Sequence, residues 1–264
     1  MIVALIDNGS LEPAAQRNLR AVATALAKRA GVDVAPVSWK HSDRIAAGAL
    51  EGVAASTLAP WVRAQVARGE REFLFVPFFI SAQGAIGSAL RGELEQLAAE
   101  LGGFAFAFTN GLAAHGVLAK IVAARVRETL ATKKLSRPAA IIVDHGGPSP
   151  TSAALRDTIA AEVRTLLGSE VAGLAPTSME GTHGPLLAAQ LAAPGFAEGD
   201  VIVAPLFLSP GRHAGPDGDL ARIARAAPAR IHFADLVGTH PATVDALTEA
   251  LRHALSAPAP LLSA

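Results

Sequence analysis

The chain lacks cysteine, an excess of charge of either sign, and any long apolar run. Without cysteine it can form no disulfide and no thiolate metal site, so any metal must be held by imidazole, carboxylate or carbonyl groups. The 23 basic and 23 acidic residues give a net charge of zero, which leaves no electrostatic footprint for nucleic acid or an anionic membrane. No apolar run approaches the roughly 20 residues of a membrane span. We therefore expect neither nucleic acid nor a membrane as a partner.

The first residues of the chain also lack a targeting signal. The segment 1–6 leads directly into a predicted strand and has no basic region of the kind that opens a signal peptide. Hydrophobic residues make up 51% of the sequence, which is ample for a core. These features predict a cytoplasmic protein.

Short apolar runs alternate with segments in which apolar residues recur at helical spacing. This alternation predicts an α/β fold with parallel sheets and right-handed crossovers. The predicted strands are 3–6, 32–39, 73–80, 104–108, 140–143, 171–177, 201–208 and 230–234. The first predicted helix begins at residue 13. The others cover 58–67, 86–101, 117–130, 151–167, 185–192, 219–225 and 242–255.

Four short motifs occur twice, in the same order. The pairs start at Asp7 and Asp144, Pro36 and Pro176, Val76 and Ala204, and Ala114 and Thr239, with offsets of 137, 140, 128 and 125. Ordered matches of this kind indicate an internal repeat. We predict two tandem homologous halves, residues 1–134 and 135–264, meeting in the polar, proline-ended segment 132–138. Each half should be flavodoxin- or Rossmann-like, with a mainly parallel sheet flanked by helices.

The halves differ in the residues that can do chemistry. The second half has His145, Glu180 and His213 where the first has Asn8, Lys40 and Ala85. Each of the three follows or ends a predicted strand, and the carboxyl ends of parallel strands form the ligand-binding edge of such a sheet. Two imidazoles and a carboxylate can ligate a divalent metal and can move protons near neutral pH. We therefore predict one active site, in the second half.

Other polar residues near these positions have simpler interpretations. Asp217 and Asp219 lie at a predicted helix start, where we favour N-capping over metal ligation. His183 is either part of a loop or a further site member. His240 has the counterpart His115, which indicates a helix-entry feature shared by both halves.

The second half resembles the class II tetrapyrrole chelatases, particularly the sirohydrochlorin cobalt- and ferrochelatases known as CbiX and SirB. The resemblance rests on the strand ending in His145-Gly146, on the run from Pro205 to Gly211-Arg212-His213, and on the stretch 236–241 before the last helix. It covers the first half as a degraded copy. The chain is therefore similar to the long, two-half form of the family, with a degenerate N-terminal half that lacks the histidine pair.

The resemblance implies a lyase that inserts Co²⁺ or Fe²⁺, or else Ni²⁺, as substrate into sirohydrochlorin or a related tetrapyrrole, in cobalamin or siroheme biosynthesis. It implies that His145 and His213 bind the metal and take protons from the macrocycle, with Glu180 as the associated carboxylate. Arg212 and the backbone N–H groups of Gly146 and Gly147 are candidates to meet a macrocycle carboxylate. The fused form predicts a monomer with an internal pseudo-two-fold.

Other functions remain open or are disfavoured. Glycine spacing gives neither a dinucleotide fingerprint nor a Walker sequence, so we expect no nucleotide. A nucleophilic hydrolase is disfavoured, because no serine lies in a G-x-S-x-G nucleophile elbow. Long family members often keep a histidine pair in the first half, where this chain has Asn8 and Ala85. The alternatives are therefore a non-catalytic protein that binds and delivers a tetrapyrrole or metal, and a purely structural pseudoenzyme.

Overall fold

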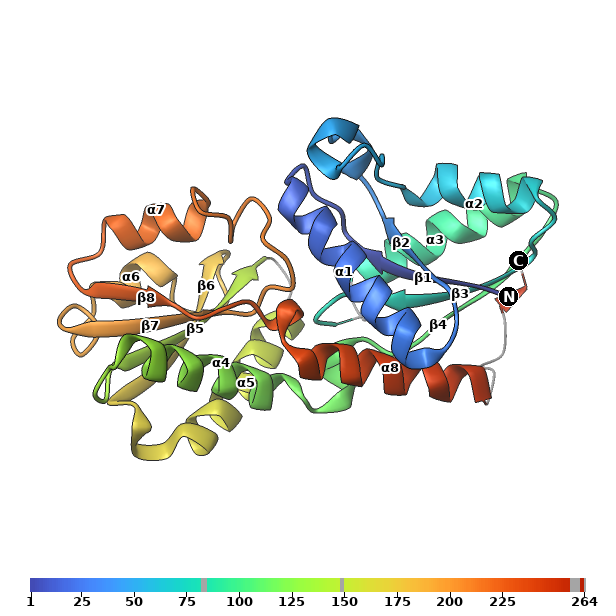
Figure 1. Ribbon diagram of the computed structural model, residues 1–264. Coiled ribbons are helices and arrows are strands. Elements are labelled where there is room, and N and C mark those ends of the chain that lie inside the picture. Colours follow the sequence, from blue (N-terminus) through green and yellow to red (C-terminus); the bar gives the residue numbers. More distant parts are fainter. Residues whose placement is uncertain (82–84, 148–149, 257–261, 264) are drawn as a thin grey trace. The chain divides into compact units, whose positions relative to one another are not determined.

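The computed structural model describes residues 1–81, 85–147, 150–256 and 262–263, and strands alternate with helices through both repeats (Figure 1). The first repeat contains β1 (Ile2–Asp7), α1 (Pro13–Ala30), β2 (Val34–Ser38), α2 (Leu58–Ala67), β3 (Glu72–Pro77), α3 (Ala85–Glu100), β4 (Ala105–Phe108) and α4 (Leu118–Lys133). The second contains β5 (Ala139–Gly146), α5 (Pro150–Leu167), β6 (Gly173–Glu180), α6 (Leu187–Leu191), β7 (Asp200–Pro205), α7 (Asp219–Arg225), β8 (Arg230–Phe233) and α8 (Pro241–Ser256).

The strands form two sheets with the same internal order. One has the order β2-β1-β3-β4-β9, where β9 (Leu262–Ser263) is a short strand antiparallel to β4. The other has the order β6-β5-β7-β8, and all its pairs are parallel. The predicted α/β fold with two homologous, mainly parallel halves is confirmed. In this order the chain reverses direction across the sheet between β1 and β3, and again between β5 and β7, and such switch points are where doubly wound folds bind ligands.

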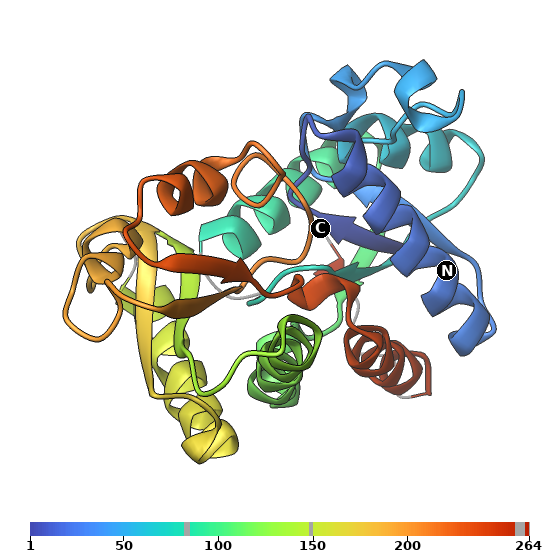
Figure 2. The same ribbon diagram turned by 60° about the vertical axis from the view of Figure 1, so that its left-hand side comes forward.

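The chain divides into two compact units that do not coincide with the repeats. The first unit comprises residues 1–116 and 241–264, and the second comprises residues 117–240. In the first unit α8 packs beside α1, and in the second α4 packs beside α5 (Figures 1 and 2). The last helix of each repeat therefore belongs to the unit built on the other repeat's sheet. The predicted boundary at 134/135 refers to the sequence repeat and not to the compact units, and it remains a prediction.

The first unit has an aromatic core on the face of its sheet that α2 and α3 cover. Leu58, Val62, Leu90 and Leu94 from these helices are fully buried there. They pack on phenylalanines of β3 and β4 and on Phe104, which precedes β4. Trp61 lies at the edge of this cluster, and the centroids of neighbouring rings in it are 5.1 to 6.2 Å apart. Apolar side chains at alternate strand positions thus fill this face, as expected for a covered parallel sheet.

The second unit covers the corresponding face with much shorter helices. Here α6 has 5 residues and α7 has 7, whereas α2 has 10 and α3 has 16. The core on this face consists of smaller side chains, including Ile141, Val201, Leu187, Leu191 and Leu220. α4 and α5 cover the other face of the same sheet (Figure 2).

The strand ends next to the predicted site differ from the predicted ones. β5 and β6 run on to Gly146 and Glu180, which pair with each other beyond the rest of the sheet. β7 stops earlier than predicted, at Pro205, and the Leu206 N–H makes a last bond to the Val143 carbonyl of β5 at 2.8 Å. Gly146 has φ 83°, and a side chain there would collide with the carbonyl of Glu180. Only glycine therefore allows the two strand ends to approach this closely.

Each unit has a buried polar group at the strand ends of its sheet. In the second unit the Arg156 guanidinium on α5 is buried, donates to Ser178 Oγ and to the carbonyl oxygen of His183 at 3.1 Å, and lies 3.6 Å from Asp144 Oδ1. Ser178 Oγ also donates to Asp144 Oδ1 at 2.5 Å. One cation thus ties together β5, β6 and the loop that follows β6.

The first unit has the same carboxylate without the cation. Asp7 is the counterpart of Asp144, and its register partner on β2 is Ser38. Ser38 Oγ lies 3.2 Å from Gln16 Oε1. Burial raises the pKa of Asp7 to about 6, although hydrogen bonds from Ser38 and the Gly9 N–H oppose the rise.

The buried Asp7 makes the first unit sensitive to pH. Because the folded pKa of Asp7 lies above the unfolded one, the cost of burying this group is absent below about pH 4 and grows as pH rises through about 6. We expect Asp7→Asn, which mimics the protonated acid, to raise the free energy of unfolding by roughly 2–3 kcal/mol more at pH 7.5 than at pH 4. Urea denaturation at both pH values measures this difference. Asp33→Asn, at an exposed position, controls for the loss of one carboxylate, and an equal effect of Asp7→Asn at both pH values would contradict the assignment.

The helix exchange predicts which fragment of the chain folds. A polypeptide of residues 117–240 contains the whole second unit, whereas residues 135–264 lack α4 and carry α8 without α1. Since α4 buries Leu118, Ile121, Val122 and Val126, its loss exposes a large apolar surface. We expect the first fragment to unfold cooperatively on heating and the second to show no cooperative transition in circular dichroism. Equal melting behaviour of the two fragments would count against the exchange.

Candidate functional site

The structure brings His145 and His213 together at the switch point of the second sheet. His145 is the penultimate residue of β5, and His213 lies in the loop that follows β7. Their ring centroids are 4.5 Å apart, with the rings inclined at 72°. The Phe207 ring lies nearly parallel to the His213 ring at a centroid distance of 6.3 Å. The two imidazoles therefore face the same small volume.

Each imidazole has an acceptor at Nδ1. His145 Nδ1 is 3.2 Å from the carbonyl oxygen of Gly146 and 3.5 Å from Glu180 Oε1. His213 Nδ1 is 2.6 Å from Asp219 Oδ2. Because carbonyl and carboxylate oxygens only accept, Nδ1 of each neutral ring must carry the hydrogen. The Nε2 atom of each ring is then left with a lone pair that can bind a metal or accept a proton.

The charge state of His213 follows from its surroundings. Burial lowers the pKa of His213, the positive charges of His145 and Arg212 lower it further, and Glu180 acts in the opposite direction. The Asp219 carboxylate also favours the protonated ring, so the ring is held between opposing influences. With its pKa below the ordinary value of 6.5, the His213 ring is neutral at pH 7 and able to act as a ligand or base.

Asp219 has a different role from the predicted one. It is the first residue of α7, and the preceding N-cap position is Gly218, with no side-chain capping bond. The N-cap interpretation of Asp219 is therefore wrong. Its carboxylate instead accepts from His213 and pairs with Arg222 one turn along the helix. Asp217 does not cap α7 either, since it pairs with Arg225 at 2.9 Å.

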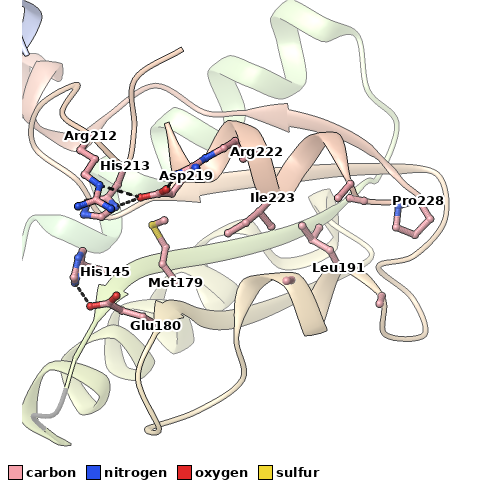
Figure 3. Close-up of a pocket in the computed structure, with 14 residues that line it drawn as sticks. His145, Met179, Glu180, Leu191, Arg212, His213, Asp219, Arg222, Ile223 and Pro228 are labelled. Atoms are coloured by element: carbon pink, nitrogen blue, oxygen red, sulfur yellow. Dashed lines mark hydrogen bonds and ion pairs between the residues drawn. The ribbon is translucent and has the colours of Figure 1, made fainter. Parts of the chain in front are cut away.

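These residues line one pocket in the second unit, with a volume of about 820 Å³ (Figure 3). Its polar end is formed by His145, Glu180, Arg212, His213, Asp219 and Arg222. The remainder is apolar and is formed by Met179 and by residues of α6, of α7 and of the turn after α7, which are Ala188, Leu191, Ala192, Ile223, Ala226, Ala227 and Pro228. Figure 3 shows the histidines at one end of this space and Pro228 at the other.

The remaining predicted site residues lie at the mouth of the pocket or beside it. Glu180 and Arg212 both line the pocket, with side chains 64% and 83% exposed. Gly146 ends β5, and the turn after Gly147 includes residues 148–149, which lie outside the described residues. His183 contributes its backbone carbonyl to Arg156 and is not among the residues that line the pocket.

The ligand set is incomplete in the part of the chain that the structure describes. There, no three histidine, aspartate or glutamate side chains converge closely enough to hold a metal ion by themselves. Glu180 faces Nδ1 of His145 rather than the space in front of both rings. The protein can therefore offer a metal two imidazole nitrogens, and its remaining ligands must come from water or from a bound molecule.

The corresponding edge of the first unit carries different side chains. Lys40 and Trp39 occupy the positions of Glu180 and Met179, and the Lys40 ammonium lies 4.1 Å from the centroid of the Trp39 ring. Trp39 Nε1 donates to Glu93 Oε2 on α3 at 2.7 Å, and Lys40 Nζ is 3.9 Å from the same oxygen. These contacts link the end of β2 to α3 through side chains that differ from those lining the pocket of the second unit.

Comparison with known proteins agrees with the internal repeat. The family model CbiX matches residues 2–129 and again residues 139–254, once in each repeat. The chain belongs to the CbiX family. No curated protein is similar enough in sequence to match the chain.

Solved structures of family enzymes share the fold over nearly the whole chain. SirB from Bacillus subtilis with Fe³⁺ is 14% identical, with a TM-score of 0.67, and the match covers 96% of this chain and 95% of that one. The sirohydrochlorin chelatase SirB from B. subtilis subspecies spizizenii in complex with cobalt is 15% identical, with a TM-score of 0.69 and coverages of 98% and 97%. CbiX, the terminal enzyme of siroheme biosynthesis in denitrifying bacteria, is 20% identical, with a TM-score of 0.66 and coverages of 96% and 99%.

One further finding concerns membranes. Among the helices of the described residues, none combines the length and the apolar character needed to cross a bilayer.

The contact between Asp219 and His213 predicts a measurable tautomer. In the wild type, ¹⁵N spectra should show the His213 proton on Nδ1, because Asp219 accepts from that atom. Asp219→Asn should lower the pKa of His213 further and reduce metal affinity or turnover by about 10- to 100-fold. Asp217→Asn, which removes the partner of Arg225 from the same loop, is the matched control. Unchanged His213 signals in Asp219→Asn would refute this role.

Proposed function

We propose that this CbiX family member inserts a divalent metal ion into a tetrapyrrole. The observation that carries the proposal is the pair of imidazoles, 4.5 Å apart at one pocket, each with its Nδ1 atom next to a carboxylate. Family membership and the shared fold of SirB and CbiX support it. We further propose sirohydrochlorin as the tetrapyrrole and Co²⁺ or Fe²⁺ as the metal, since neighbouring structures contain cobalt or iron.

Metal insertion requires a balance of protons and charge. The macrocycle gives up two pyrrole N–H protons and receives one divalent cation. The reaction therefore needs a group that presents the metal and groups that accept protons. Neutral imidazole can do both near pH 7.

We assign the roles by position in the pocket. His213, the more buried of the two rings and held by Asp219, is the metal ligand. His145, which is more exposed and lies beside Glu180, is a second ligand or the proton acceptor. Glu180 reaches solvent with 64% of its side chain exposed, so it can pass a proton from His145 to water.

The incomplete ligand set suits a metal that is substrate and not a permanent cofactor. Two neutral nitrogens bind Co²⁺ or Fe²⁺ without thiolates, and the chain has no cysteine. Water molecules that complete the coordination can be lost one by one as the pyrrole nitrogens replace them. A third protein ligand would make release to the macrocycle harder.

Charged groups at the mouth of the pocket suit a substrate with carboxylates. Arg212 lines the pocket and is 83% exposed, so its guanidinium is available to a carboxylate. We assign the N–H groups of Gly146 and Gly147 to a second carboxylate, since turns that precede a helix commonly bind anions. Sirohydrochlorin, which carries several carboxylates, would use both.

The decisive experiment is anaerobic spectrophotometry of sirohydrochlorin with Co²⁺ or Fe²⁺. We expect rapid insertion by the wild type and a loss on the order of 10²- to 10⁴-fold in His213→Ala and in His145→Ala. His253→Ala, at an exposed position on α8, is the control and should behave like the wild type.

Two results would decide against this function. A spectral shift of the bound macrocycle without insertion would identify a carrier that binds and delivers. Insertion at the wild-type rate by His145→Ala and His213→Ala would show that the metal is handled elsewhere.

A further inference from the structure

The apolar part of the pocket exists because two helices of the second repeat are short. In the first unit α2 and α3 cover the sheet over 10 and 16 residues and bury leucines and valines against its phenylalanines. In the second unit α6 and α7, with 5 and 7 residues, cover less of the same face. The pocket occupies the space between these two helices and ends at the imidazole pair.

One side of each short helix faces this groove, which we call the α6–α7 groove. On α7 and at its C-cap the lining residues are Asp219, Arg222, Ile223 and Ala226, spaced i, i+3, i+4 and i+7. On α6 and at its C-cap they are Ala188, Leu191 and Ala192, spaced i, i+3 and i+4. Such spacings place side chains on one helix face. The groove is thus a built surface of two helices, with alanines where larger side chains would close it.

Charge is distributed unevenly along the groove. Arg222 and Arg212 lie at the end near the histidines, and Arg222 is 63% exposed while pairing with Asp219. Beyond Arg222 the lining is apolar as far as Pro228. A ligand that fits must present an apolar face to the partly buried Met179 and Ile223 and a negative group to the arginines. A volume of about 820 Å³ is large enough for one part of a macrocycle beside the metal.

We propose that the α6–α7 groove holds one pyrrole edge of the substrate tetrapyrrole, with the ring against Met179 and Ile223 and a carboxylate on Arg222. This assignment rests on the proposed function and adds the orientation of the substrate to it. An edge held in the groove would lead the macrocycle directly to the Nε2 atoms, because the groove is continuous with the imidazole pair. Productive alignment of the pyrrole nitrogens with the metal then follows from binding.

The test narrows the groove without touching the histidines. Ala188 lines it, whereas the neighbouring Ala189 does not, and both are exposed on α6. We expect Ala188→Trp to weaken the binding of metal-free sirohydrochlorin at least tenfold, with Ala189→Trp within twofold of the wild type. Ala226→Trp fills the groove from the facing helix, at an exposed position, and should act like Ala188→Trp.

Two measurements separate the groove from the metal site. Absorbance titration under anaerobic conditions gives macrocycle affinity, and calorimetry with Co²⁺ alone gives metal affinity. The proposal expects both groove variants to lose macrocycle affinity while their Co²⁺ affinity stays at the wild-type value. Wild-type macrocycle affinity in Ala188→Trp and Ala226→Trp would overturn the groove assignment and leave the proposed function intact. A wild-type protein that does not bind sirohydrochlorin would overturn the proposed function itself.

Discussion

The geometry of the site depends on one buried cation. The Arg156 guanidinium holds Asp144 at the end of β5, Ser178 near the end of β6, and the carbonyl of His183 in the next loop. His145 follows Asp144 directly, and Glu180 lies two residues beyond Ser178. Removing a partner from a buried charge network is costly, because the remaining charge is left without compensation. The spacing between the histidine and the glutamate is therefore set by a residue that does not line the pocket.

The first repeat shows the same strand-end scaffold without the histidine pair and without the buried arginine. Its glycine approach between strand ends and its aspartate–serine pair remain, at Gly9, Asp7 and Ser38. No arginine neutralises the aspartate, and Trp39 and Lys40 are engaged by Glu93 on the longer α3. Strand-end geometry and ligand chemistry are thus separable properties of this fold. The first repeat has the strand-end geometry, but it carries Trp39 and Lys40 where the second has Met179 and Glu180.

The sequence predicts the fold and the histidine pair because both follow from strict periodic constraints. Parallel strands end at one edge, so His145 and His213 had to lie near each other once β5 and β7 were neighbours. The role of Asp219 could not be predicted in this way, since an acid at a helix start is equally compatible with capping. Arg156 gave no signal either, because arginine at a helical position is normally exposed. The pattern of α4 and α8 shows that each has an apolar face, but it does not show which sheet receives that face.

The exchange of terminal helices limits how far the two repeats can diverge. α4 belongs to the repeat without the histidine pair, yet it packs in the unit that carries the pair. The stability of that unit therefore depends on residues 118–133 of the other repeat. Conversely, α8 follows the strands of the second repeat and packs in the first unit. Side chains at the strand ends of one repeat can change independently, but deletion of that repeat would remove a structural helix from the other unit.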